Sequence, residues 1–160
     1  MNSTEFRSLV ADFNRRIMKG RYVYLWHGTE GGLSEVLPSD ITSKMDILKT
    51  LSTVDISACP ADEIDRLIKK GIPVGLIDLL NLPKPRILVV INACLLARYR
   101  TGIQMYYDNF VGDGTMLVFQ VARCNPEVVK LPSFVKFEPQ TCFNYLANLV
   151  KNDHVIEEEE

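Results

Sequence analysis

Three glycines follow an aromatic and β-branched run near the start of the chain, in RYVYLWHGTEGGLSE at residues 21–35. A glycine-rich loop between a buried strand and a helix can bind phosphate, because backbone N–H groups converge on its oxygens and the helix adds its positive end. The candidate phosphate-binding residues are His27, Gly28, Gly31, Gly32, Ser34 and, further along the chain, Asn92. The interpretation left open is that the glycines form a simple turn, as they often do after a strand.

This loop lacks the cation that nucleotide chemistry needs. The phosphate-binding pattern G-x-x-x-x-G-K-[ST] ends in a lysine that contacts the β and γ phosphates and a hydroxyl that holds magnesium. Aligning Gly32-Leu33-Ser34 with its last three positions places His27 at the first glycine and Leu33 at the lysine. Losing the ammonium removes a strong point charge from a triphosphate site.

A second departure concerns the acidic residue near magnesium. The best candidate strand for that motif, ILVVIN at residues 87–92, ends in Asn92, and an amide cannot neutralise a metal. Together the two departures predict an NTPase-like fold without NTPase chemistry, hence no catalytic residue, no metal and no cofactor. ATP binding through an atypical loop is the alternative.

His27 is the other residue that could do chemistry. It follows the first predicted strand, at the edge where open α/β sheets bind ligands, and its titration range suits proton transfer. The alternative is that it serves as a local hydrogen-bond partner. The chain contains no G-x-S-x-G and no H-E-x-x-H pattern. Its four cysteines lie in or beside apolar runs without a C-x-x-C pair, which favours packing and a reducing, cytoplasmic setting.

Two segments have the composition of contact surfaces. The first 21 residues carry a local excess of positive charge, and RYRTGIQMYYDNF at 98–110 mixes arginine with aromatic residues. The residues expected on a contact surface are Arg7, Arg15, Arg98, Arg100, Tyr106, Tyr107 and Phe110. Tyrosine and arginine are enriched at protein interfaces, and they also clamp single-stranded nucleic acid. The net charge of −2 favours a protein partner over nucleic acid. For the basic start, a solvated helix face is the other interpretation.

Strands and helices alternate along the chain. Hydrophobic spacing and capping signals predict helices over 3–18, 43–51, 61–70, 93–111 with a break near Thr101 and Gly102, and 140–152. Predicted strands cover 22–26, 54–58, 86–92, 116–122 and 134–138, while 77–81 could be either. Such alternation predicts a three-layer α/β fold with a mostly parallel sheet of about five strands, like that of P-loop NTPases. The strand at 86–92 is apolar on both faces and belongs inside the sheet.

The 160 residues suffice for one domain with a single core. We expect that domain over residues 1–152 and an acidic, mobile tail over 153–160, because four consecutive glutamates repel one another. The apolar runs are too short to span a bilayer, so we expect no membrane contact.

The order of elements, with RILVVINACLLARY at 86–99 and LPSFVKFEPQTCFNYL at 131–146, resembles a small AAA-like P-loop domain over roughly residues 15–150. Among such proteins the chain is similar to the small P-loop subunit of BREX-type phage-defence systems. The resemblance implies a non-catalytic, NTPase-like subunit that docks to a larger protein in a cytoplasmic assembly. The alternatives are a nucleotide-binding hydrolase with an atypical P-loop and an accessory protein that binds single-stranded nucleic acid.

Overall fold

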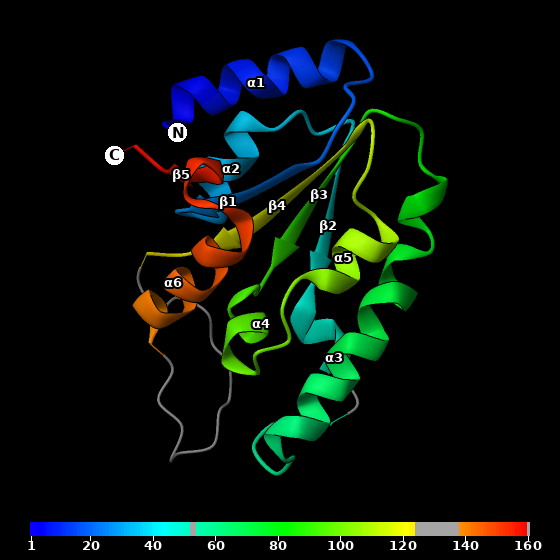
Figure 1. The fold of residues 1–160 in the computed structure, drawn as a ribbon, viewed down its shortest axis with the longest axis vertical. Helices are drawn as coiled ribbons and strands as arrows, with labels where there is room; N and C mark the ends of the chain where they lie inside the picture. Colours follow the sequence, from blue (N-terminus) through cyan, green and yellow to red (C-terminus); the bar gives the residue numbers. More distant parts are fainter. Residues whose placement is uncertain (52–53, 124–137, 160) are drawn as a thin grey trace.

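A computed structural model describes residues 1–51, 54–123 and 138–159 (Figure 1). The strands are β1 (Tyr22–His27), β2 (Thr42–Asp46), β3 (Arg86–Ile91), β4 (Thr115–Val121) and β5 (Val155–Glu157). The α-helices are α1 (Ser3–Arg15), α2 (Glu30–Val36), α3 (Ala61–Leu76), α4 (Cys94–Arg98), α5 (Gln104–Asn109) and α6 (Pro139–Val150). Short 3-10 turns form η1 (Ile47–Leu51), η2 (Leu79–Asn81) and η3 (Asn152–His154).

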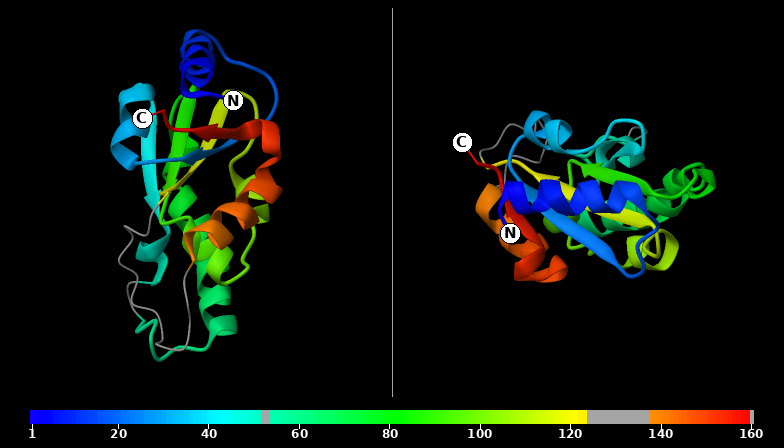
Figure 2. Two further views of the ribbon diagram at one scale, coloured as in Figure 1. Left: turned by 90° about the vertical axis from the view of Figure 1, so that its left-hand side faces the viewer. Right: turned by 90° about the horizontal axis from the view of Figure 1, so that it is seen from above.

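The five strands form one sheet in the order β2-β3-β4-β1-β5, and every neighbouring pair is parallel. This confirms the predicted α/β class and the parallel sheet of five strands. Both faces of the sheet are covered, as Figures 1 and 2 show. On one face α1 and α2 pack against side chains such as Tyr24, Trp26 and Val89. On the other face α3, α4, α5 and α6 pack against the alternate side chains of the same strands.

The second strand of the sheet is not the predicted one. Residues 54–58 form turns, and β2 lies at Thr42–Asp46, where the sequence predicted a helix from about Ser43. The strand occupies the edge of the sheet, and Met45 is its single buried residue. Because an edge strand with so few apolar residues carries no clear alternation, its identity depends on pairing with β3.

Helix α3 continues past its predicted end at residue 70 and runs through Gly71, Pro73 and Gly75 to Leu76. A Cβ on Gly71 would lie 2.7 Å from the Cβ of Thr50 in η1, and one on Gly75 would lie 2.9 Å from the Cε of Met45. The glycines therefore allow close packing of this helix against its neighbours, whereas the sequence suggested a helix stop.

Other predicted elements agree more closely. The break between α4 and α5 includes Thr101 and Gly102, as predicted, and β3 is buried on both faces between β2 and β4. Helix α1 begins one residue after Asn2, whose side chain accepts from the backbone N–H of Glu5 in a capping box, so the cap is neither Ser3 nor Thr4. The strand predicted at 134–138 lies almost wholly outside the described residues.

The C-terminal residues differ most from expectation. In place of an acidic tail, Val155–Glu157 pair with β1 as the edge strand β5, and Ile156 is fully buried. The aliphatic residues Val155 and Ile156 attach the segment to the sheet before the run of glutamates continues. Among the described residues, no helix combines the length and apolar character needed to cross a bilayer.

Candidate functional site

The connection between β1 and α2 consists of two residues, Gly28 and Thr29. Thr29 caps α2, because its hydroxyl oxygen accepts from the backbone N–H of Gly32 at 3.0 Å. Gly31 and Gly32 therefore belong to the first turn of α2. The turn is tighter than the extended glycine loop that the phosphate-binding pattern describes.

The geometry of α2 explains why a leucine stands where the aligned pattern has lysine. Leu33 is 1% exposed and faces the sheet, so an ammonium at this position would enter the core. The hydroxyl of Ser34 donates to the backbone oxygen of Glu30 at 2.9 Å. The two residues aligned with K-[ST] thus serve the packing of the helix.

A carboxylate of the chain itself occupies the glycine turn. Glu158 accepts a hydrogen bond from the backbone N–H of Thr29 at 2.7 Å and another from the Thr29 hydroxyl at 2.8 Å. An added Cβ on Gly28 or Gly32 would meet Glu158 at 2.4 or 1.6 Å, so both glycines leave the space that its side chain fills. We call the turn at Gly28–Gly32 with the bound Glu158 carboxylate the glutamate clasp.

His27 lies beside the clasp and contacts the preceding glutamate. Its Nδ1 is 2.8 Å from the carboxylate of Glu157, and its ring stacks on Phe143 of α6 with centroids 4.1 Å apart. Arg123, just after β4, donates to the backbone oxygens of His27 and Glu158. These contacts hold the C-terminal segment on the ends of β1 and β4, which agrees with the interpretation of His27 as a local hydrogen-bond partner.

Buried polar side chains donate hydrogen bonds to the backbone of the turn. Gln120 of β4 is 4% exposed and donates to the backbone oxygen of Gly28 at 2.7 Å, while the indole N–H of Trp26 donates to that of Thr29 at 3.0 Å. Both contacts fix the backbone of the connection.

The ring of Tyr24, deeper in β1, stacks on His154, just before β5. Burial, with smaller contributions from Tyr22 and Asp153, raises the pKa of Tyr24 to about 12. The folded chain therefore favours the neutral form of Tyr24.

Asn92 does not join this cluster. It follows β3, which β4 separates from β1, and its side chain donates to Asp46 at 2.7 Å. Asp46 also accepts a hydrogen bond from the backbone N–H of Leu48 at 2.9 Å. Asn92 and Asp46 therefore order the chain after β3 and β2. The backbone of Asn92 has φ +56°, a left-handed conformation that asparagine tolerates.

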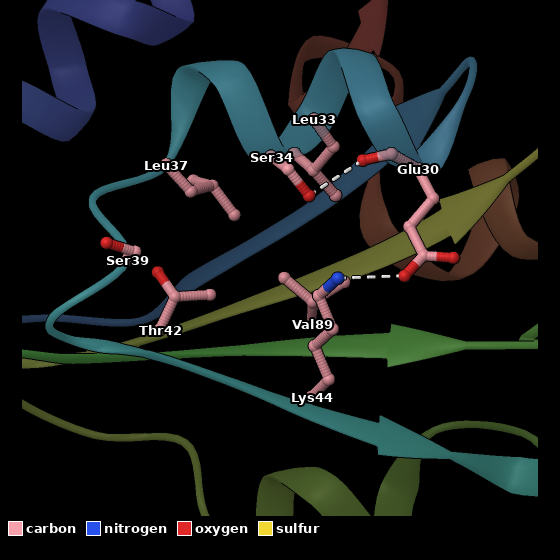
Figure 3. Close-up of a pocket in the computed structure, with 8 residues that line it drawn as sticks. All are labelled: Glu30, Leu33, Ser34, Leu37, Ser39, Thr42, Lys44 and Val89. Carbon is pink, nitrogen blue, oxygen red and sulfur yellow. Dashed lines mark hydrogen bonds and ion pairs between the residues drawn. The ribbon is translucent and has the colours of Figure 1, made fainter.

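An open pocket lies on the other side of α2, between this helix, β2 and β3 (Figure 3). It has a volume of about 190 Å³. Leu33, Leu37 and Val89 form its apolar part, and Ser34, Ser39 and Thr42 add hydroxyls. At one end the ammonium of Lys44 lies 2.8 Å from a carboxylate oxygen of Glu30 (Figure 3). We call this the α2 pocket.

The residues predicted for a contact surface divide into exposed and buried groups. Arg7, Arg15 and Arg100 are exposed, while Arg98 and Tyr107 are half-buried. Tyr106 and Phe110 are 0% and 5% exposed, so they are core residues and the expectation that they lie on a contact surface is wrong. An arginine lies over each of three aromatic rings in this region: Arg21 over Tyr107, Arg86 over Phe110 and Arg98 over Tyr99.

The sequence did not predict the roles of Thr29, Gln120, Arg123 and Glu158 in this site. A glutamine within the apolar strand MLVFQVA was a usable signal, because a buried amide needs a partner. Nothing local links residue 158 with residue 29.

The described residues contain no cluster of three His, Cys, Asp or Glu side chains suited to a metal ion. No protein-family model, curated protein or solved structure matched this chain in the comparisons.

Proposed function

We propose that this chain is a non-catalytic, NTPase-like interaction subunit of a larger cytoplasmic assembly, of the phage-defence kind that the sequence resemblance implies. The observation that carries the non-catalytic part is the glutamate clasp. The carboxylate of Glu158 already receives the N–H and hydroxyl groups of Thr29 that an incoming phosphate would need.

The side chains around the clasp support the same conclusion. Leu33, which is aligned with the lysine of the pattern, packs in the core. Asn92 follows β3, two strands away from β1, and its side chain donates to Asp46. A triphosphate placed at the turn would meet the negative charges of Glu157 and Glu158, and like charges at such short range repel strongly. Both features argue against nucleotide turnover.

Exposed apolar side chains support the interaction part of the proposal. Val74 and Ile77, at the C-terminal end of α3, are 65% and 58% exposed, and Leu80 and Leu82 follow at 42% and 41%. Four large apolar residues exposed within nine positions are typical of a surface that a partner protein covers. The exposed arginines of α1, Arg7 and Arg15, offer a second contact region.

Nucleotide binding tests the non-catalytic part directly. Titration calorimetry of the chain with ATP and magnesium should give no binding heat, and a phosphate-release assay should give no turnover. Glu158→Gln, which removes the clasp charge, should also give no turnover because no lysine replaces it. Glu159→Gln is the matched charge control.

Turnover by the unaltered chain that Gly32→Asp abolishes would contradict the proposal and favour the hydrolase alternative. Micromolar ATP binding that appears in Glu158→Gln and is absent in Glu159→Gln would favour a different function. The chain would then be a nucleotide-binding protein whose site is blocked by the carboxylate of Glu158.

Partner capture tests the interaction part. Affinity capture of the tagged chain from its native cells, with cross-linking and mass spectrometry, should yield a larger protein cross-linked near α3. Val74→Ser with Ile77→Ser should reduce its recovery at least about fivefold, a factor in the range of interface anchors. Leu149→Ser, at a 38% exposed position on α6, should leave recovery unchanged. Equal recovery with all variants would exclude the end of α3 as the contact surface.

A further inference from the structure

The α2 pocket is distinct from the glutamate clasp, although both involve α2. The clasp lies at the start of the helix and is filled by Glu158. The pocket lies along the side of α2 that faces β2 and β3, and Figure 3 shows the labelled side chains around it. Among the residues that line the pocket, only Ser34 was predicted from the sequence to bind a ligand, and that ligand was phosphate.

The pocket is large enough for one small apolar group. Its volume is about 190 Å³, and a cavity of about 150 Å³ lined by similar aliphatic side chains binds benzene. The pocket therefore has room for a single ring or a branched aliphatic chain against Leu33, Leu37 and Val89. A nucleotide or a fused polycyclic cofactor would extend out of the pocket into solvent.

The hydroxyls of the pocket are partly committed to the backbone. Ser34 donates to the oxygen of Glu30, and Thr42 donates to the oxygen of Pro38 at 2.7 Å. A strong remaining donor is the ammonium of Lys44, which has three N–H groups and gives one of them to Glu30. The charged groups of this site are Lys44 and Glu30, so recognition of a ligand's charges depends on this pair.

The Lys44–Glu30 pair favours a ligand that carries both charges. Both side chains are about half exposed, at 47% and 46%, so they can separate without leaving water. A ligand with a carboxylate alone would take Lys44 and leave Glu30 without its cation, and one with an ammonium alone would do the reverse. A zwitterion satisfies both groups at once.

We propose that the α2 pocket binds a free apolar α-amino acid, with its side chain between Leu33, Leu37 and Val89. Its carboxylate pairs with Lys44 and its ammonium pairs with Glu30. This binding function is independent of the glutamate clasp and of any nucleotide.

Phenylalanine is the probe that matches the volume and both charges. In nuclear magnetic resonance titrations of the isotope-labelled chain, phenylalanine at up to about 10 mM should shift the signals of Leu33, Leu37 and Val89 saturably. Phenylacetate, which lacks the ammonium, and phenethylamine, which lacks the carboxylate, should each bind at least about fivefold more weakly.

Variants of the charge pair separate the proposal from a site for simple anions. Lys44→Gln and Glu30→Gln should each weaken phenylalanine binding about fivefold. Lys49→Gln in η1 and Glu35→Gln in α2 change exposed charges that do not line the pocket, so they should leave it unchanged.

Three results would overturn the proposal. The first is the absence of saturable shifts at the pocket residues. The second is equal binding of phenylacetate and phenylalanine. The third is tighter binding of phenylalanine to Glu30→Gln, because that result would mean that only the ligand's carboxylate is recognised and that Glu30 competes with it for Lys44.

Discussion

The two regions at α2 differ in what fills them. At the start of the helix, Gly28 and Gly32 of the glycine pattern lie against the chain's own Glu158 carboxylate. Along its side, the helix leaves an open pocket of about 190 Å³ that ends in the Lys44–Glu30 pair (Figure 3). A glycine pattern therefore identifies where space exists beside a backbone. It does not identify what takes that space.

The two regions should also differ in their contribution to stability. The clasp joins residue 158 to residue 29 and fastens an edge strand that has only three residues. The Lys44–Glu30 pair joins two half-exposed side chains that water can solvate separately. Removing clasp contacts should therefore lower the free energy of unfolding, whereas removing pocket charges should hardly change it.

The largest expected effect concerns the attachment of β5. Ile156→Ala should lower the free energy of unfolding by about 3 kcal/mol, because Ile156 is fully buried and its truncation leaves a cavity. Urea unfolding followed by circular dichroism measures the change. Val155→Ala, at a half-buried position, should cost less than half as much. A loss below about 1 kcal/mol for Ile156→Ala would mean that β5 does not stabilise the sheet.

Alkaline pH should loosen the same segment through Tyr24. Burial raises its pKa to about 12 in the folded chain, above the usual value of 10.0. The associated stability is fully present below pH 10 and is lost as the pH rises to 12, by up to about 2–3 kcal/mol. Urea unfolding between these pH values should show a shallower decline for Tyr24→Phe than for the unaltered chain.

Tyr107→Phe is the control for that measurement and should keep the original pH dependence. Tyr106, whose pKa burial also raises, remains in both variants, so some decline should persist. Identical pH profiles for the unaltered chain and Tyr24→Phe would contradict the prediction.

A smaller effect tests the fit of Glu158 into the glycine turn. Gly32→Ala should displace the Glu158 carboxylate and lose the clasp hydrogen bonds, whereas a Cβ on Gly31 meets nothing within 4 Å. Gly32→Ala should therefore be about 1 kcal/mol less stable than Gly31→Ala, although both replacements favour the helix. Thermal and urea unfolding of the two variants provide the comparison.

The same pair in a Glu158→Ala background completes the test. Without the carboxylate, the difference between Gly32→Ala and Gly31→Ala should vanish, because the added methyl group no longer displaces a hydrogen-bonded side chain. If the difference in the free energy of unfolding persists, another contact of Gly32 causes the loss of stability.

The smallest expected effect concerns the pocket. Lys44→Gln should change the free energy of unfolding by less than about 0.5 kcal/mol, as expected for a half-exposed ion pair. Urea unfolding measures this as well. A loss as large as that of the clasp variants would show that the pair stabilises the fold and would remove the contrast between the two regions.

Much of the fold followed from local patterns. The aromatic and apolar runs at β1, β3 and β4 identified three adjacent strands of the sheet, because buried parallel strands must be apolar on both faces. Misplaced elements lay where local signals were weak or ambiguous. The polar edge strand β2 needed β3 beside it, and Gly71 resembled a helix end although it permits contact with Thr50.

The candidate site was less predictable for the same reason. His27, Gly28 and Gly32 do come together, as their spacing suggested, but Ser34 faces the α2 pocket and Asn92 pairs with Asp46. Tyr106 looked like a contact residue in an arginine-rich segment, yet its ring packs against Phe119 in the core. A segment with both arginine and aromatic residues does not reveal which of them face inward.

Local sequence patterns were enough to predict the alternation of strands and helices, the buried strands and the glycine turn after β1, since these depend on residues close together in the chain. The contact of Glu158 with the glycine turn and that of Lys44 with Glu30 beside an open pocket become visible only in the folded chain. Contacts between residues 29 and 158 or 30 and 44 depend on how the strands are ordered in the sheet. That order is set by the packing of the whole chain, and no local pattern of residue types encodes it.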